Sequence, residues 1–382
     1  MGKHRKIKQY LLNNQNRTIY FKGLNGIRAL AALAVVFIHI AGFHKKRFGL
    51  PSFKDSINLK LEEIGSDAVT VFFTLSGFLI TYLLLQEKKI TGTVDVKKFY
   101  VRRVLRIWPL YYLYLGIALI VIALFKIHIA PLNIFFYFFL CGNIPYILGT
   151  SFYVIGHFWS IGVEEQFYII WPFLLKQVQK NILLKLCIGL IFFCAVKLLV
   201  YTNYQVGSIP YGIVSTNRFD CMMIGAVFAT LLYNGQVLPF TTKSVNLIVC
   251  LSAIVLLCVI EFNNPFHSML ISILTCILIN SQIQERTFLI NLDKPLFNFL
   301  GKISYGIYVI HPLVLFCISA IIKTSTLPVL FKYICAYVGG FAITILIAYL
   351  SYEYFEKKIL LLKEKYTIVR SSALQTGNLI QA

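Results

Sequence analysis

Two ionisable residues, Arg28 and His39, stand eleven positions apart at the ends of one apolar stretch. Eleven residues make about three turns of α-helix, so both side chains are predicted to share a helix face, about 16 Å apart along the axis. An ionisable group inside a membrane-length apolar segment is costly and is by default a functional candidate. The simpler alternative is that Arg28 reaches a lipid headgroup and that His39 ends the helix.

A second candidate pair, Arg103 and Arg106, lies three positions apart at the start of another apolar stretch. Side chains at this spacing share a helix face. Two guanidinium groups on one face suit a phosphate or pyrophosphate anion, because each binds bidentately and keeps its charge. The alternative is that both arginines flank a helix end and contact lipid phosphate.

A carboxylate stands inside the apolar stretch FWSIGVEEQFY at residues 158–168. Glu164 falls in the first two turns of the expected helix, where a carboxylate needs a cation, a hydrogen-bond donor or a raised pKa. Ser160, one turn earlier, and Tyr168 are supporting candidates. Pairing of Glu164 with Arg28 or Arg218 would give it a structural role instead.

Two more clusters carry polar groups into apolar surroundings. Arg218 and Asp220 open another apolar stretch, where the simplest interpretation is an internal ion pair. In ISYGIYVIHP, Ser304, Tyr308 and His311 occupy positions i, i+4 and i+7 and so form one polar stripe on a helix. Hydrogen bonding between helices would explain this stripe as well as catalysis would.

The elements that must position these residues are membrane helices. The chain has 382 residues, of which 58% are hydrophobic and 13% charged, against about 25% charged in a soluble domain. With a mean hydropathy of +0.75, the chain is predicted to be an all-α integral membrane protein, a polytopic bundle of about ten transmembrane helices with no separate soluble domain. The expected spans are 26–43, 66–85, 107–126, 158–175, 182–201, 213–233, 244–261, 266–281, 302–322 and 328–350.

One further apolar segment, 131–148, is interrupted by Asn143 and Pro145. It is predicted to be re-entrant or interfacial, with an eleventh span as the alternative. The apolar stretch that begins near residue 26 lacks a small-residue cleavage pattern, so we expect it to remain as the first span rather than to be removed as a signal peptide.

The net charge of +21 indicates lipid rather than nucleic acid as the partner, because Lys and Arg gather in short loops beside apolar helices. Basic residues are frequent in the first 23 residues, in 86–106 and in the tail, and absent from 127–157 and 201–212. This pattern predicts a cytoplasmic basic segment at 1–23, a transmembrane domain at 24–352 and a cytoplasmic basic tail at 353–382. The loop at 44–65 disagrees, since it is also basic and would lie outside.

The nine cysteines are scattered and form no CxxC pair, and no spacing of metal ligands occurs. We therefore expect buried thiols, no metal site and no bound cofactor.

Several stretches, in this order, resemble blocks of acyltransferase family 3, membrane proteins that O-acylate bacterial surface glycans. They are LNGIRALAA with His39, AVTVFFTLSGFLI at 68–80, RVLR at 103–106, FWSIGVEEQFY, and SYGIYVIHP. The resemblance covers about residues 20–360. One departure is Asn25, where the family commonly has Asp.

The resemblance implies transfer of an acyl group, usually acetyl from acetyl-CoA, to a hydroxyl of a sugar or other acceptor. It implies a catalytic pair of His39 with Arg28, phosphate binding by Arg103 and Arg106, and a place in the bacterial cytoplasmic membrane. Some family members carry an additional esterase-like domain, which we do not expect within these 382 residues.

A neutral imidazole at His39 would be a credible general base for the acceptor hydroxyl. Glu164 or Asp220 could orient the ring, and Ser76, Ser160 or a tyrosine could carry an acyl-enzyme intermediate. The rival function is a transporter or flippase for a saccharide-linked or anionic substrate, with intramembrane charges lining its path. The acceptor, the acyl chain and the oligomeric state are not determined by the sequence.

Overall fold

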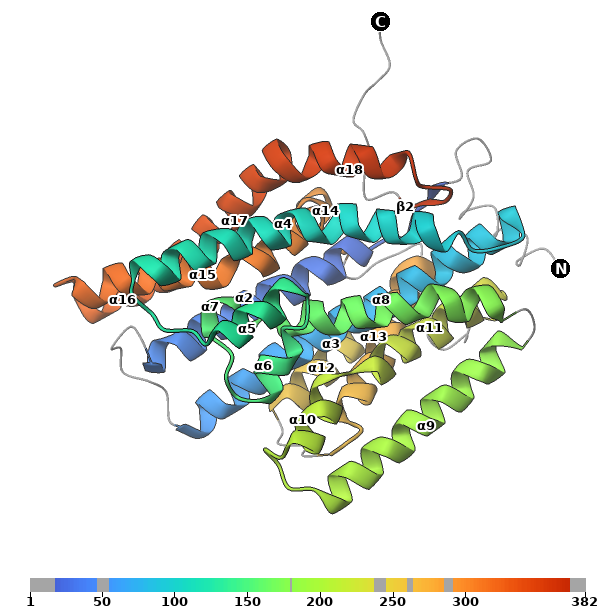
Figure 1. The fold of residues 1–382 in the computed structure, drawn as a ribbon, viewed down its shortest axis with the longest axis horizontal. Helices are drawn as coiled ribbons and strands as arrows, with labels where there is room; N and C mark the ends of the chain where they lie inside the picture. Colours follow the sequence, from blue (N-terminus) through green and yellow to red (C-terminus); the bar gives the residue numbers. More distant parts are fainter. Residues whose placement is uncertain are drawn as a thin grey trace, which may run out of the picture.

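The computed structural model describes residues 18–46, 55–178, 181–236, 245–259, 264–284 and 291–371, and these are almost entirely helical (Figure 1). The longer helices are α2 (Leu24–Lys46), α3 (Asp55–Thr91), α4 (Val96–Leu124), α8 (Trp159–Gln177), α9 (Ile182–Asn203), α11 (Phe219–Tyr233), α12 (Val245–Val259), α13 (His267–Gln284) and α15 (Ser304–Thr324). The shorter helices are α5 (Pro131–Phe138), α6 (Asn143–Ile147), α7 (Tyr153–Gly156), α10 (Ile209–Thr216) and α14 (Pro295–Lys302).

The last helical stretch runs without interruption from Val329 to Glu364. It consists of α16 (Val329–Ile334), the π-helical turn η2 (Cys335–Gly339), α17 (Gly340–Ser351), the π-helical turn η3 (Tyr352–Glu356) and α18 (Lys357–Glu364). The predicted boundary between residues 352 and 353 therefore falls inside a helix. Strand β1 (Thr18–Ile19), before α2, pairs in parallel with strand β2 (Arg370–Ser371), after α18.

Six of the described helices are long and apolar enough to cross a membrane, so the all-α membrane class is confirmed. They cover Leu24–Ala41, Gly65–Thr91, Val96–Leu124, Ile182–Asn203, Ser304–Thr324 and Val329–Glu364. Each of the ten predicted spans overlaps a described helix, but the span 213–233 is divided between α10 and α11, and the count of about ten is not confirmed. Helix α11 has only 15 residues, about 22 Å of helix against a hydrocarbon core of about 30 Å. The broken segment 131–148 forms α5 and α6 rather than one continuous helix.

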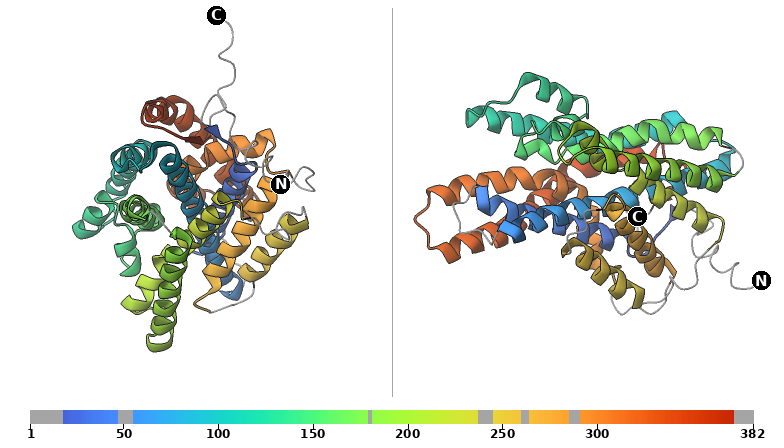
Figure 2. Two further views of the ribbon diagram at one scale, coloured as in Figure 1. Left: turned by 90° about the vertical axis from the view of Figure 1, so that its right-hand side faces the viewer. Right: turned by 90° about the horizontal axis from the view of Figure 1, so that it is seen from below.

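Helix α3 lies at the centre of the bundle and packs against α2, α8, α11, α12 and α13 (Figure 2). Its contact with α11 is very close, because a Cβ atom on Gly77 would collide with the carbonyl oxygen of Met222. A Cβ atom on Gly225 would likewise collide with the carbonyl oxygen of Thr74. Small residues at a helix crossing allow this approach of two backbones in a membrane. The crossing therefore fixes α3 within the bundle.

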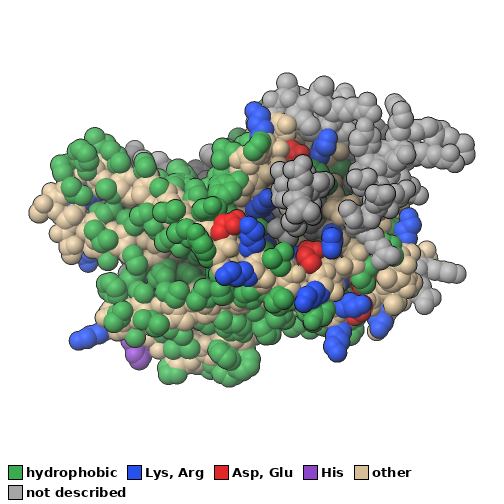
Figure 3. Space-filling view, turned by 90° about the horizontal axis from the view of Figure 1, so that it is seen from above, with side chains coloured by type: hydrophobic (Ala, Val, Ile, Leu, Met, Phe, Trp, Pro, Cys, Tyr) green, Lys and Arg blue, Asp and Glu red, His purple; other side chains and the backbone are tan. Residues whose placement is uncertain are grey.

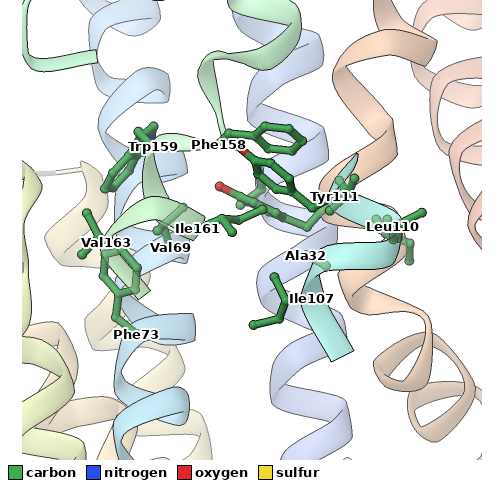
Figure 4. Close-up of a cluster of buried hydrophobic side chains, with 14 of the residues drawn as sticks. Ala32, Val69, Phe73, Ile107, Leu110, Tyr111, Phe158, Trp159, Ile161 and Val163 are labelled. Carbon is green, nitrogen blue, oxygen red and sulfur yellow. The ribbon is translucent and has the colours of Figure 1, made fainter. Parts of the chain in front are cut away.

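An aromatic cluster fixes the segment that joins α7 to α8 (Figure 4). The rings of Tyr111 and Phe158 stack with centroids 4.1 Å apart, and Trp159 meets Phe73 edge-on at 5.8 Å. The Tyr114 hydroxyl donates a hydrogen bond of 2.6 Å to the carbonyl of Val154. This packing holds the backbone of residues 157–160 in place.

The described parts of the basic segments meet at one end of the bundle, on the right in Figure 1. There Arg102 forms an ion pair of 2.8 Å with Glu87 and donates to the carbonyl of Tyr366. Lys88 donates to backbone carbonyls at the end of α8, a position where a cation is favoured. In Figure 3 basic and acidic side chains gather over one half of the visible face, while the other half is mostly hydrophobic. The basic loop at 44–65 lies partly outside the described residues.

Candidate active site

Three adjoining pockets run through the bundle from its basic end. We name them the arginine pocket, the central pocket and the histidine pocket. The arginine pocket is lined by Arg28, Arg102, Arg103, Arg106, Lys302 and Lys363, among others. The central pocket is lined by Ser76, Ser160, Glu164, Tyr168, Tyr305 and Tyr308, among others. The histidine pocket is lined by His39, Ser66, Tyr146, Ser151, His157 and Trp159, among others.

Shared side chains connect these pockets in series. Arg28, Ser76, Arg103 and Arg106 line both the arginine pocket and the central pocket. The central and histidine pockets share Val69 and Tyr308. The three pockets therefore lie in series from the basic end of the bundle, past Arg28, to His39, and we call this series the passage.

Arg28 lies at the junction of the arginine and central pockets, within electrostatic range of Arg103, Arg106 and Glu164. It forms no salt bridge with any residue in the described ranges. Asn25, the departure from the family pattern, donates instead to the side-chain oxygen of Asn298 at 3.1 Å. An orienting contact from position 25 to Arg28 is thus absent from the described structure, and Arg28 faces the other arginines across the passage.

His39 forms a hydrogen bond with His311, with Nδ1 of His39 2.8 Å from Nε2 of His311. Nδ1 of His311 lies 3.1 Å from the carbonyl oxygen of Ile307, which can only accept, so Nδ1 of His311 carries the hydrogen. In a neutral imidazole the other nitrogen is then an acceptor, and Nδ1 of His39 must be the donor. This assignment leaves Nε2 of His39 unprotonated and basic, on a side chain that lines the histidine pocket.

A third histidine, His157, completes this cluster, its ring centroid 5.5 Å from that of His311. Its Nε2 donates to the carbonyl of Val309 at 3.1 Å, and its buried Nδ1 has no hydrogen-bond partner. The sequence analysis did not select His157, although a histidine within an apolar stretch was a usable signal. Among the described residues, no three or more His, Cys, Asp or Glu side chains are arranged to hold a metal ion.

Glu164 lies in the central pocket, and the structure does not bring it to His39. Its carboxylate accepts hydrogen bonds from Ser76 at 2.7 Å and from Tyr168 at 3.2 Å. The hydrogen-bond partner of Nδ1 of His39 is His311, so the expected role of Glu164 in orienting this ring stays a prediction. Glu164 instead places a carboxylate opposite the arginines of the passage.

The expected ion pair between Arg218 and Asp220 is also wrong. Asp220 pairs with Lys197 of α9, which donates to Ser268 as well, while Arg218 donates to Ser66 and to Thr70 of α3. Arg218 precedes the first residue of α11, and residues two positions apart do not face each other on a helix. Asp220 is therefore held by α9, and Arg218 contacts the histidine pocket through Ser66.

The polar stripe of α15 faces the passage. The hydroxyls of Ser160 and Tyr308 share a hydrogen bond of 2.6 Å, and both lie within hydrogen-bonding distance of the carbonyl of His157, at 3.3 and 2.9 Å. Ser304 and Tyr308 line the central pocket, and His311, one turn further, reaches His39. The stripe thus contributes to two of the three pockets.

Residues 21–353 match the family model of an acyltransferase domain, which is most of the chain. The chain belongs to acyltransferase family 3. This confirms the resemblance that the motifs indicated, over nearly the same range of residues.

Two relatives illustrate this membership. The chain is 30% identical over 380 residues to the peptidoglycan O-acetyltransferase of Listeria monocytogenes, covering 89% of this chain and 56% of that protein. It is 27% identical over 368 residues to a provisionally named O-acetyltransferase of Staphylococcus aureus strain COL, covering 88% of this chain and 57% of that protein. The chain thus spans little more than half the length of these relatives. No solved structure matches it.

Proposed function

We propose that this protein is a membrane O-acyltransferase that moves an acyl group, acetyl in the simplest case, from acyl-CoA to a hydroxyl of a cell-surface saccharide. The observation that carries the proposal is the passage of three connected pockets, with clustered arginines at one end and a basic imidazole nitrogen at the other. Family membership supports acyl transfer rather than transport as the function.

The donor would bind from the basic end. Arg103 and Arg106 offer guanidinium groups to its phosphates, and the buried Nε of Arg103 has no hydrogen-bond partner among the described residues. The acyl arm would then extend past Arg28 into the central pocket. Since basic loops favour the cytoplasmic side, we assign this end and both termini to the cytoplasm of a bacterium, where acyl-CoA is made.

The acceptor would enter the histidine pocket. Tyr146, Tyr153 and Trp159 provide flat apolar surfaces there, and Ser66 and Ser151 provide hydroxyl groups, a combination that suits a sugar ring with its hydroxyls. The name of the Listeria relative includes peptidoglycan, which is one such saccharide.

In the direct route, Nε2 of His39 removes the proton from the acceptor hydroxyl as its oxygen attacks the thioester carbonyl carbon. A C–O bond forms, the C–S bond breaks, and the coenzyme A thiolate takes the proton back from the imidazolium. His311 would stabilise the imidazolium by accepting from Nδ1 of His39.

The test uses bacterial membrane vesicles that contain the protein, its endogenous acceptor and [¹⁴C]acetyl-CoA. We expect label in saccharide, released as acetate by mild alkali, as an ester requires. His39→Ala should lower the initial rate by about 10²- to 10⁴-fold, the usual contribution of a positioned base. The matched control is His128→Ala, because His128 is exposed and lines none of the three pockets. Absence of labelled ester with the wild type, or a loss of only a few-fold in His39→Ala, would refute the proposal.

A further inference from the structure

The end of the last helical stretch and the segment that follows it form one wall of the arginine pocket. Lys363, Glu364, Thr367 and Val369 all line that pocket. The segment is held by the pairing of β2 with β1 and by the hydrogen bond from Arg102 to the carbonyl of Tyr366. These residues belong to the predicted basic tail at 353–382, and in the structure they line the arginine pocket.

The charge of the arginine pocket favours the binding of a polyanion. Six basic side chains and two carboxylates line it, an excess of four positive charges. One carboxylate, Glu87, is paired with Arg102, and the other, Glu364, is paired with Arg370, which does not line the pocket. Lys363 forms no salt bridge with any residue in the described part of the chain. Like charges gathered in this way are stabilised by a bound anion.

The pockets that each basic residue lines indicate which part of a bound anion it would contact. Arg103 and Arg106 line both the arginine and the central pocket, so they stand next to the arm that carries the acyl group. Lys363 lines the arginine pocket and does not line the central pocket. In coenzyme A the pantetheine arm leads first to the pyrophosphate and then to the ribose, which bears a separate 3′-phosphate.

We propose that Lys363 binds the 3′-phosphate of coenzyme A, while Arg103 and Arg106 bind its pyrophosphate. This inference rests on the proposed function for the identity of the donor. A compact ammonium group with three donors suits a terminal phosphate, which presents its oxygens in several directions. The C-terminal segment is therefore part of the donor site.

The experiment measures the dissociation constants of coenzyme A and of dephospho-coenzyme A, which lacks only the 3′-phosphate. Purified full-length protein in neutral detergent is used at one fixed ionic strength. We expect the wild type to bind coenzyme A about tenfold more tightly than the dephospho form. Lys363→Ala should remove this difference by weakening coenzyme A binding alone, and Lys363→Arg should retain most of it.

Dephospho-coenzyme A is also the internal test of folding, because Lys363→Ala should bind it as the wild type does. The matched control is Lys358→Ala, on the same helix α18, exposed and absent from the pocket lining. An equal loss of both ligands, or an unchanged tenfold preference, in Lys363→Ala would overturn the assignment of Lys363 and leave the proposed function standing. Failure of the wild type to bind either ligand would overturn the proposed donor as well.

A lipid phosphate is the other possible source of the anion. Adding phosphatidylglycerol to the micelles should leave the preference for coenzyme A unchanged, with phosphatidylcholine as the neutral control. Loss of the preference in phosphatidylglycerol alone would assign the pocket to a lipid headgroup and refute the inference.

Discussion

Replacing His311 with alanine removes the acceptor that holds the His39 ring in its basic tautomer. The lost contact is a hydrogen bond of 2.8 Å, and His311 is fully buried, so water does not readily replace it. A hydrogen bond to a group that becomes charged contributes about 1.5–3 kcal/mol. We therefore expect kcat to fall about 10- to 150-fold, since about 1.4 kcal/mol corresponds to a factor of ten. KM for acetyl-CoA should stay the same, because His311 lines neither the arginine nor the central pocket.

The assay compares four variants, His311→Ala, His311→Gln, His39→Ala and the double variant, by initial rates of acetyl transfer, each normalised to folded protein. His311→Gln is the conservative variant, since its side-chain oxygen can accept from Nδ1 of His39, and it should recover much of the lost rate. The decisive arm adds His311→Ala to His39→Ala. If His311 acts only through His39, the second substitution should slow the reaction no further.

Two results would refute this reasoning. One is a double variant that is slower than His39→Ala by the full factor lost in His311→Ala alone, since His311 would then act independently of His39. The other is a well-folded His311→Gln protein that is no faster than His311→Ala.

Three further predictions follow from other contacts. Arg103→Lys or Arg106→Lys should raise KM for acetyl-CoA several-fold with little change in kcat, because the charge remains and the bidentate geometry is lost. Unchanged kinetics in both variants would favour the alternative that these arginines contact lipid phosphate. Glu164→Gln should lower the melting temperature, because it weakens two hydrogen bonds to a carboxylate, at a cost of about 1–3 kcal/mol of stability in total. Activity should fall only in proportion to the amount of folded protein. A variant that is stable but inactive would show that Glu164 has a catalytic role. Asp95→Ala should cost about 1 kcal/mol of stability at pH 7, because the Asp95 carboxylate caps α4 by accepting from the backbone N–H of Lys98 at 3.0 Å. That hydrogen bond lowers the pKa of Asp95. Its contribution to stability is therefore present above the ordinary carboxyl pKa and is lost as the pH falls through the lowered pKa of the folded state. A difference in melting temperature between the wild type and Asp95→Ala that persists at pH 2 would contradict the capping role.

The helices could be predicted from the sequence because apolar runs of membrane length have few alternatives. The face shared by Arg28 and His39 was also predictable, since helix periodicity alone determines it, and both residues line the passage. The same holds for the stripe of Ser304, Tyr308 and His311.

Partners on different helices could not be predicted, because periodicity does not determine which helices become neighbours. Glu164 has several polar groups within reach in principle, and only the packing of α8 against α3 gives it Ser76. Lys197 lies in the middle of an apolar helix and was not selected, yet it replaces Arg218 as the partner of Asp220. The role of Lys363 as a pocket residue depends on the return of the C-terminal segment to α4.

Helix α3 contributes side chains to all three pockets, from Ser66 in the histidine pocket to Glu87 in the arginine pocket. These residues are 21 positions apart on one uninterrupted helix, about 32 Å at 1.5 Å per residue. That length matches the hydrocarbon thickness of a bilayer, about 30 Å. In the proposed function, coenzyme A and the saccharide would therefore bind from opposite faces of the membrane, and the pantetheine arm would carry the acyl group through the bundle between them.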